Sequence, residues 1–215
     1  MIKGIFWDND GILVDTEPLY FRATSEVLAR FGVELTQQQF IDISLKDGSS
    51  LFSLAADNLT TAELGAARRS RDERYSELLR EETRIIPGVE ETMAALHGRV
   101  SMAIVTSSRP EHFALIHDRS GLLKYFDFVL TRADYVRSKP HPEPYLTALH
   151  KSGLRPEDCR VIEDSERGLL AACRAGLGCL VIPGKLTRTG DFSSAERVLA
   201  NIREVPGALD DLPPR

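Results

Sequence analysis

The sequence contains little cysteine, and the three cysteines that it has form no recognisable set. Cys159, Cys173 and Cys179 have neither the spacing of a metal-binding motif nor the even number of a disulfide framework. Cys173 lies in an apolar helical pattern and Cys179 beside an apolar run, so we expect both to be small core residues in a reducing compartment. A zinc motif built on cysteines and a disulfide scaffold are therefore excluded.

Long apolar runs and an excess of positive charge are also missing. No stretch approaches the roughly 20 residues that span a membrane, and the N-terminal residues lack the apolar stretch of a signal peptide. The net charge is −5, and the basic residues of segment 68–74 are interleaved with acidic ones. We therefore expect a cytoplasmic protein that binds neither membranes nor nucleic acid. The sequence makes no prediction about oligomeric state.

Five short apolar runs are present, and they alternate with helical patterns. The runs cover residues 2–7, 100–105, 126–130, 161–162 and 180–182. The helical patterns cover residues 89–96, 113–118, 144–150 and 169–175. Short buried strands that alternate with helices are typical of a parallel sheet covered on both faces. We therefore predict an α/β fold with a Rossmann-like parallel sheet core in a three-layer sandwich, in which ligands bind beyond the carboxyl ends of the strands.

The segment from residue 16 to residue 84 interrupts this alternation, because it has a helical pattern throughout. Helices are predicted over residues 18–31, 36–45, 50–56 and 60–82. Two pairs have the spacing of a capping box, Thr36 with Gln39 and Thr60 with Glu63. A helical insertion directly after the first strand predicts a helical cap domain of residues 16–84 on a catalytic core of residues 1–15 and 85–215. We expect the two connecting segments to act as hinges.

Polar side chains follow the ends of four predicted strands. They are, in chain order, Asp8 and Asp10, Thr106 and Ser107, Lys139, and Glu163 and Asp164. Each alone has an ordinary explanation as a turn former, a helix N-cap or a solvated lysine. Four carboxylates at one sheet edge, however, would repel each other unless a cation neutralised them, and a ligand set of oxygen atoms favours a hard ion such as Mg²⁺. The hydroxyls and the lysine would supply donors for a phosphoryl group.

The segments that carry these residues resemble the haloacid dehalogenase superfamily, in its phosphatase and beta-phosphoglucomutase-like branch. The matching segments are DNDGILVDTEP from Asp8, IVTSS from Ile104, SKPHPEPY from Ser138, VIEDSERGLLAACRAG from Val161 and LTRTGDFSSAERVL from Leu186. The resemblance spans the whole chain, with the motifs in family order. It implies a magnesium-dependent phosphatase that hydrolyses a small phosphorylated metabolite, such as a sugar phosphate, through an aspartyl-phosphate intermediate.

The resemblance also implies a role for each of these residues. The implied roles are nucleophile for Asp8, general acid and base for Asp10, and phosphate binding for Thr106, Ser107 and Lys139. The implied metal ligands are Asp8, the backbone carbonyl of Asp10, Asp164, and Glu163 either directly or through water. A nucleophilic carboxylate splits one difficult step into two easier ones, and Asp10 would protonate the leaving alcohol and then deprotonate the attacking water.

Two departures from the mutase pattern favour hydrolysis over mutation. Tyr20 replaces a histidine, and the loop of residues 45–50, which resembles the mutase specificity loop, lacks a basic residue near its end. The residues expected to select the substrate are Tyr20, Lys46, Gly48 and Ser49. A beta-phosphoglucomutase-like phosphosugar mutase is the alternative function.

Three other classes agree less well with the sequence. A haloacid dehalogenase proper typically lacks the second aspartate, Asp10. A signalling receiver module combines similar residues at a sheet edge, but it is about half this length and has no helical insertion. A non-catalytic phosphate-binding module on the same fold is disfavoured because every polar catalytic position is filled.

Overall fold

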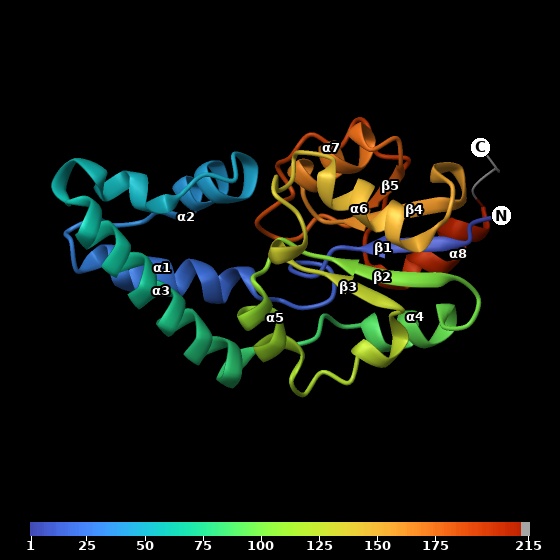
Figure 1. Cartoon of the computed structure of the whole chain (residues 1–215), viewed down its shortest axis with the longest axis horizontal. Helices are drawn as coiled ribbons and strands as arrows, with labels where there is room; N and C mark the ends of the chain where they lie inside the picture. Colours follow the sequence, from blue (N-terminus) through green and yellow to red (C-terminus); the bar gives the residue numbers. More distant parts are fainter. Residues whose placement is uncertain (212–215) are drawn as a thin grey trace.

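A computed structural model of the chain describes residues 1–211, with the exception of the side chain of Asn58. Across these residues six parallel strands form one sheet in the order β3-β2-β1-β4-β5-β6 (Figure 1). The strands are β1 (Gly4–Trp7), β2 (Ser101–Val105), β3 (Phe128–Leu130), β4 (Cys159–Glu163), β5 (Gly178–Val181) and β6 (Arg197–Val198). The strand order reverses between β1 and β4, which is where open α/β sheets bind their ligands.

Helices cover both faces of the sheet and complete three layers. On one face lie α4 (Val89–Leu96), α5 (Pro110–His117) and α8 (Val205–Asp210), and on the other α6 (Glu143–Ser152) and α7 (Glu166–Arg174). Successive side chains of a strand point to opposite faces, so Ile5 and Trp7 of β1 pack into the first core and Phe6 into the second. The predicted α/β sandwich is confirmed.

The segment between β1 and α4, which we call the helical insertion, lies to one side of the sheet (Figure 1). It contains α1 (Glu17–Ala29), α2 (Gln37–Gln39), a π-helical turn (Phe40–Lys46), a 3-10 helix (Leu51–Asn58) and α3 (Thr61–Glu82). Both predicted capping boxes are present, at Thr36 and at Thr60. The single helix expected over residues 36–45 is instead a short α-turn that widens into the π-turn, where the amide of Asp47 donates to the carbonyl of Asp42.

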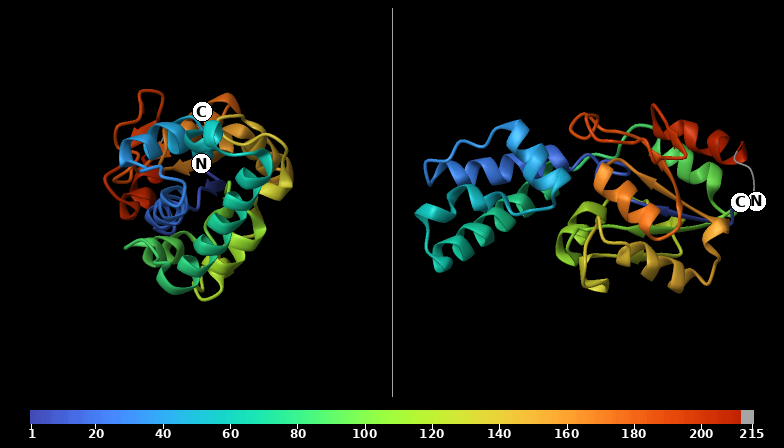
Figure 2. Two further views of the ribbon diagram at one scale, coloured as in Figure 1. Left: turned by 90° about the vertical axis from the view of Figure 1, so that its left-hand side faces the viewer. Right: turned by 90° about the horizontal axis from the view of Figure 1, so that it is seen from above.

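The two connections between the insertion and the sheet pair with each other. Val14 and Ile85 form an antiparallel bridge, the amide of Asp15 donates to the carbonyl of Arg84 at 3.0 Å, and the amide of Ile86 donates to the carbonyl of Leu13 at 3.0 Å. The insertion and the N-terminus lie at opposite ends of the molecule (Figure 2). The division into a cap of residues 16–84 and a core of residues 1–15 and 85–215 stays a prediction.

Three details differ from the sequence expectations or go beyond them. Cys173 is exposed, so its assignment to the core is wrong: it lies near the end of α7 and is not among the buried residues of that helix. The edge strand β6 and the short helix α8 were not anticipated, because two and six residues are too few for a clear pattern.

Among the described helices, none has the length and apolar character required to cross a bilayer.

A buried ion pair next to β6 generates a test of stability. The Arg160 side chain is 1% exposed, and its Nε lies 2.6 Å from Oε2 of Glu196. Glu196→Ala would leave a buried guanidinium without its carboxylate, which should lower the free energy of unfolding by about 3–5 kcal/mol in urea denaturation. As a control, Glu91→Ala removes a solvent-exposed pair with Arg203 and should change stability little. Equal losses in the two variants would contradict this prediction.

Candidate active site

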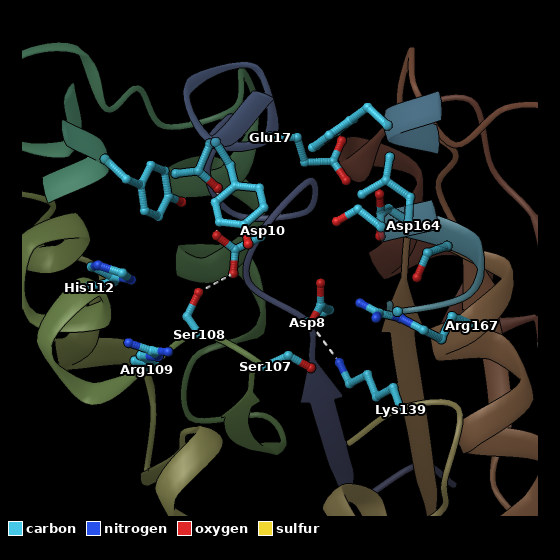
Figure 3. Close-up of a pocket in the computed structure, with 18 of the residues that line it drawn as sticks. Asp8, Asp10, Glu17, Ser107, Ser108, Arg109, His112, Lys139, Asp164 and Arg167 are labelled. Atoms are coloured by element: carbon cyan, nitrogen blue, oxygen red, sulfur yellow. Dashed lines mark hydrogen bonds and ion pairs between the residues drawn. The ribbon is translucent and has the colours of Figure 1, made fainter. Parts of the chain in front are cut away.

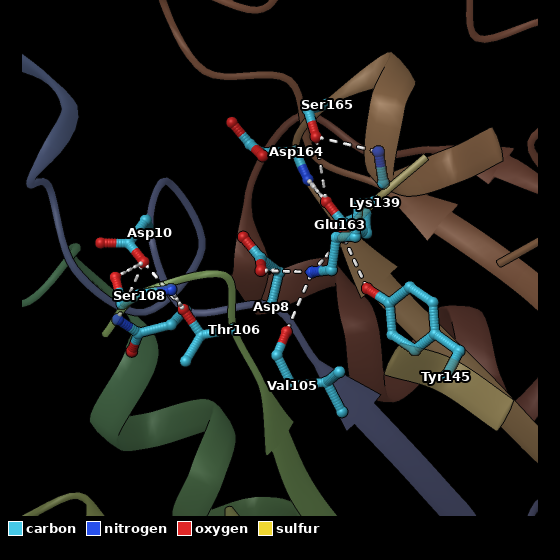
Figure 4. A network of polar contacts seen from close by, with 12 residues as sticks. Asp8, Asp10, Val105, Thr106, Ser108, Lys139, Tyr145, Glu163, Asp164 and Ser165 are labelled. Atoms are coloured by element: carbon cyan, nitrogen blue, oxygen red, sulfur yellow. Dashed lines mark hydrogen bonds and ion pairs between the residues drawn. The ribbon is translucent and has the colours of Figure 1, made fainter. Parts of the chain in front are cut away.

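Lys139 lies buried between two carboxylates at the carboxyl ends of β1 and β4 (Figure 4). Its ammonium is 2.6 Å from Oδ1 of Asp8 and 2.7 Å from Oε1 of Glu163, and it donates to the carbonyl of Val105 at 2.9 Å. Burial lowers the pKa of Lys139. The negative charges of Asp8 and Glu163 raise it by a larger amount, so the net pKa lies above the ordinary value of a lysine. The hydroxyl of Tyr145 donates to the same Glu163 oxygen at 2.5 Å. Lys139 is therefore a charged, fixed cation.

Asp8, Glu163 and Asp164 form a cluster in which one carboxylate oxygen from each residue lies within 4.8 Å of the other two. Burial raises the pKa of Asp8 to about 7 although Lys139 lowers it, and burial followed by the charge of Glu17 raises the pKa of Asp164. Among residues 1–211, the buried Oδ2 atom of Asp164 has no hydrogen-bond partner. An unpaired buried oxygen and a surplus of negative charge fit a hard divalent cation such as Mg²⁺.

The side chain of Asp10 lines the same cavity as these three carboxylates but is not part of their cluster. Its Oδ1 accepts from the hydroxyl of Thr16 at 2.5 Å. Its Oδ2 accepts from Thr106 at 3.0 Å and from Ser108 at 2.8 Å (Figure 4). Three hydroxyl donors thus hold this carboxylate apart from the others. The hydroxyl of Thr106, expected to bind phosphate, here donates to Asp10.

A cavity of about 310 Å³ lies between the strand ends and the helical insertion (Figure 3). Residues that line it from the sheet side include Asp8, Asp10, Ser107, Lys139, Glu163 and Asp164. Residues of the insertion close it from the opposite side. The seven residues predicted at the strand ends thus come together in one place. Thr106 is the one of them that does not line the cavity, and its hydroxyl donates to Asp10.

The four residues expected to select the substrate do not all reach this cavity. Tyr20, Gly48 and Ser49 line it. Lys46 lies outside it, because its ammonium pairs with Asp42 at 3.3 Å along the π-turn. The structure does not bring Lys46 to the cavity, and its role in selecting the substrate stays a prediction.

Several lining residues were given no role from the sequence. Burial, and then the charges of Asp10 and Asp8, raise the pKa of Glu17 to about 8. Arg167 points into the cavity (Figure 3), and its buried Nε has no hydrogen-bond partner in the part of the chain that the structure describes. Glu17 and Arg167 both fall inside matched segments, DTEP and EDSERG, so the segments held the signal.

The cavity wall also contains an ion pair between the insertion and the sheet domain. Arg109, at the start of α5, lies 2.8 Å from Asp72 of α3. Asp72 also pairs with Arg71 of the same helix, at 2.8 Å. No sequence pattern links these positions, because the partners lie 37 residues apart and on different helices.

The comparisons with known proteins agree with this geometry. The chain matches the haloacid dehalogenase-like hydrolase family over residues 5–182 and belongs to that family. It is 32% identical to the fructose-1-phosphate phosphatase YqaB of Escherichia coli (strain K12), over 81% of this chain and 93% of that protein. It is also 32% identical to a phosphorylated carbohydrates phosphatase of Thermotoga maritima, over 82% of each chain.

A solved structure shares both the core and the insertion. The structure of CbbY from Rhodobacter sphaeroides in complex with xylulose-(1,5)-bisphosphate has a TM-score of 0.82 and 27% identity, over 95% of this chain and 96% of that one. The expected family and fold are confirmed. The expected enzyme class, a phosphoric monoester hydrolase, is confirmed as well, by the family and its phosphatase relatives.

The raised pKa values of the acidic site predict how stability depends on pH without metal. The folded protein keeps protons on Asp8 (pKa about 7) and Glu17 (pKa about 8) at pH values where the unfolded chain has lost them. Stability in excess chelator should therefore fall as pH rises through this range. We expect a melting temperature several degrees lower at about pH 8.5 than at about pH 5.5.

Added Mg²⁺ should reduce this difference, because it binds the ionised carboxylates and stabilises the folded state. Calorimetric melting curves with chelator and with Mg²⁺ measure both effects. In Asp8→Asn, which cannot ionise at this position, the pH difference in chelator should shrink. A melting temperature in chelator that rises from pH 5.5 to pH 8.5 would rule out this account of the site.

The contact between Gly48 and Arg167 generates a second test. Gly48 has φ of 68°, and a Cβ atom there would collide with the guanidinium of Arg167. Gly48→Ala should cost about 1–2 kcal/mol for the left-handed backbone, and displacement of Arg167 should also raise KM for a hydrolysed ester. Gly121→Ala is the matched control, because Gly121 has φ of 64° and, apart from its chain neighbours, no described residue has an atom within 4 Å of a Cβ placed there. If both variants keep the wild-type KM, the loop does not shape the substrate side of the cavity.

Proposed function

We propose that this chain is a Mg²⁺-dependent phosphatase that hydrolyses a small phosphorylated metabolite, such as a sugar phosphate, through an aspartyl-phosphate on Asp8. The observation that carries the proposal is the position of Asp8, which faces the cavity at the end of β1 with Lys139 at 2.6 Å. A cavity of about 310 Å³ suits a small ligand. Relatives named for fructose 1-phosphate and for phosphorylated carbohydrates support this substrate class.

In the first step a carboxylate oxygen of Asp8 attacks phosphorus, and the bond from phosphorus to the alcohol oxygen breaks. Asp10, in its protonated form, gives its proton to the leaving oxygen. Lys139 offsets the negative charge that would otherwise keep an anionic nucleophile from an anionic ester. Mg²⁺ held by Asp8, Asp164, the carbonyl of Asp10 and Glu163, directly or through water, would supply further positive charge beside the phosphoryl oxygens.

In the second step water attacks phosphorus of the aspartyl-phosphate. Asp10 accepts the proton of that water, the bond between Asp8 and phosphorus breaks, and phosphate leaves. Ser107, Thr106 and Lys139 would bind the phosphoryl oxygens in both steps. Thr106 would first have to release Asp10, to which its hydroxyl donates at 3.0 Å.

The helical insertion would act as the cap, with residues 16–84 as one domain and residues 1–15 and 85–215 as the other. Substrate must enter the cavity, and bulk water must be excluded while phosphorus is transferred. The ion pair between Asp72 and Arg109, at 2.8 Å, would form on closing and break on opening. The paired connections around Val14 and Ile85 are the position at which the cap would move.

The charges on the cap side of the cavity support hydrolysis over phosphosugar mutation. A mutase has to hold a bisphosphate by both of its phosphates, which calls for a cation on the cap side. Arg71 of α3 lines the cavity from that side, but its charge is offset by Asp72 at 2.8 Å, and Lys46, the one basic residue of the loop 45–50, is not among the lining residues.

The test is phosphate release from a panel of sugar and polyol phosphates, with wild type and Asp8→Asn. Wild type should release phosphate from at least one ester, and the variant should lose about 10³-fold or more in kcat, because an amide cannot form the acyl-phosphate. Acid quenching with ³²P-labelled ester should trap label on wild type alone. Asp15→Asn, an exposed neighbour, is the control. Turnover near the wild-type rate in Asp8→Asn would refute the covalent mechanism.

A further inference from the structure

A chain of buried polar side chains leads from Asp10 to the far end of α5. Asn9 is fully buried at the end of β1, and its Nδ2 donates to Oδ2 of Asp10 at 3.3 Å. Its Oδ1 lies 2.8 Å from Nε2 of His117, the last residue of α5. Nδ1 of His117 lies 2.9 Å from the hydroxyl of Ser120. None of these three residues has a role in the mechanism described above.

The donors and acceptors of this chain fit together in one way. Because Nδ2 of Asn9 faces a carboxylate, its Oδ1 has to accept, so Nε2 of His117 carries the hydrogen. Nδ1 is then the acceptor for the hydroxyl of Ser120. Burial lowers the pKa of His117 to about 4, although the nearby charge of Asp10 raises it, so the ring is neutral at physiological pH. His117 therefore fixes which way the Asn9 amide points.

The packing around Asn9 and His117 does not explain why these two buried side chains are polar. His117 is 6% exposed and lies against Phe113 in the apolar layer between α5 and the sheet. Burying an amide and an imidazole costs free energy that their hydrogen bonds only offset, and an apolar pair of similar size would pack as well. The polar chain ends on the carboxylate of Asp10, which points to a role there.

The two oxygens of Asp10 differ in how many donors they meet. Oδ2 accepts from Asn9, Thr106 and Ser108, whereas the described structure gives Oδ1 a single donor, Thr16. Asn9 and Ser108 together occupy both in-plane lone pairs of Oδ2, so none is left for a proton even when Thr106 turns from Asp10 to phosphate. The proton of the acid form therefore belongs on Oδ1.

We infer that Asn9, aligned by His117, is a positioning residue that occupies Oδ2 of Asp10 and so keeps Oδ1 as the oxygen that gives the proton to the leaving alcohol. This inference rests on the proposed phosphatase function. Asn9 and His117 act through Asp10 and touch neither substrate nor phosphorus. Their effect should appear only where the leaving group needs a proton.

The test compares kcat/KM for two esters, the best sugar phosphate of the panel and p-nitrophenyl phosphate, whose leaving group departs without a proton. The double variant Asn9→Leu/His117→Leu removes both partners together and leaves neither of them unpaired. We expect about a tenfold loss with the sugar phosphate, a fraction of what an acid contributes, and less than about a twofold loss with the nitrophenyl ester. His117→Gln, whose amide N–H can replace Nε2–H, should keep the wild-type ratio.

The control is Ile116→Val, a buried change one residue away on α5 that leaves the polar chain intact and should not alter the ratio. Equal losses on both esters in the double variant, or an unchanged ratio, would overturn the inference. A wild type that releases phosphate from neither ester would overturn the proposed function, and the inference with it. The two failures can be told apart, because the failure of the proposed function appears in the wild type and the failure of the inference appears only in the variants.

A second measurement does not depend on turnover or on the folding of a variant. The ¹⁵N NMR signals of the His117 ring in wild type should show a neutral imidazole with hydrogen on Nε2 at pH 7. In Asn9→Leu the Nε2 signal should shift because its acceptor is lost. A ring with hydrogen on Nδ1, or a charged ring, would overturn the inference whatever the activity.

Discussion

The buried ammonium of Lys139 is the interaction on which the centre of this molecule depends. It brings the segment after β3 against the ends of β1 and β4, and it neutralises part of the charge of Asp8 and Glu163. Without it two buried carboxylates would face each other across the middle of the sheet. Even with it the charges do not balance, because Asp164 adds a third carboxylate with an unpaired oxygen. This surplus of buried negative charge fits a site for a cation.

Two carboxylates only two residues apart reach different surroundings, which suits the different roles that we propose for them. Asp8 lies among charges, whereas Asp10 lies among hydroxyl and amide donors. A nucleophile has to be anionic when it attacks, whereas an acid has to gain and lose a proton. The buried residue between them, Asn9, takes part in holding the second carboxylate.

Patterns along the chain predicted what depends on local sequence. The apolar runs predicted five of the strands. The polar residues that follow those runs were predicted to meet at one edge of the sheet, and seven of them do. The direction in which Asp10 points was not predictable, because Thr16 and Ser108 reach it from separate segments. The pairing of Lys46 with Asp42 was not predictable either, since it depends on a π-turn that no sequence period reveals.

The paired connections at Val14 and Ile85 have a consequence for how such a protein changes over evolution. Because the chain leaves the sheet and returns to it through two hydrogen-bonded segments, the ends of the insertion meet at nearly one point. Any folded segment whose ends lie equally close can be grafted there without altering the order of the strands. The catalytic half can therefore stay constant while the substrate-facing half is exchanged as a module.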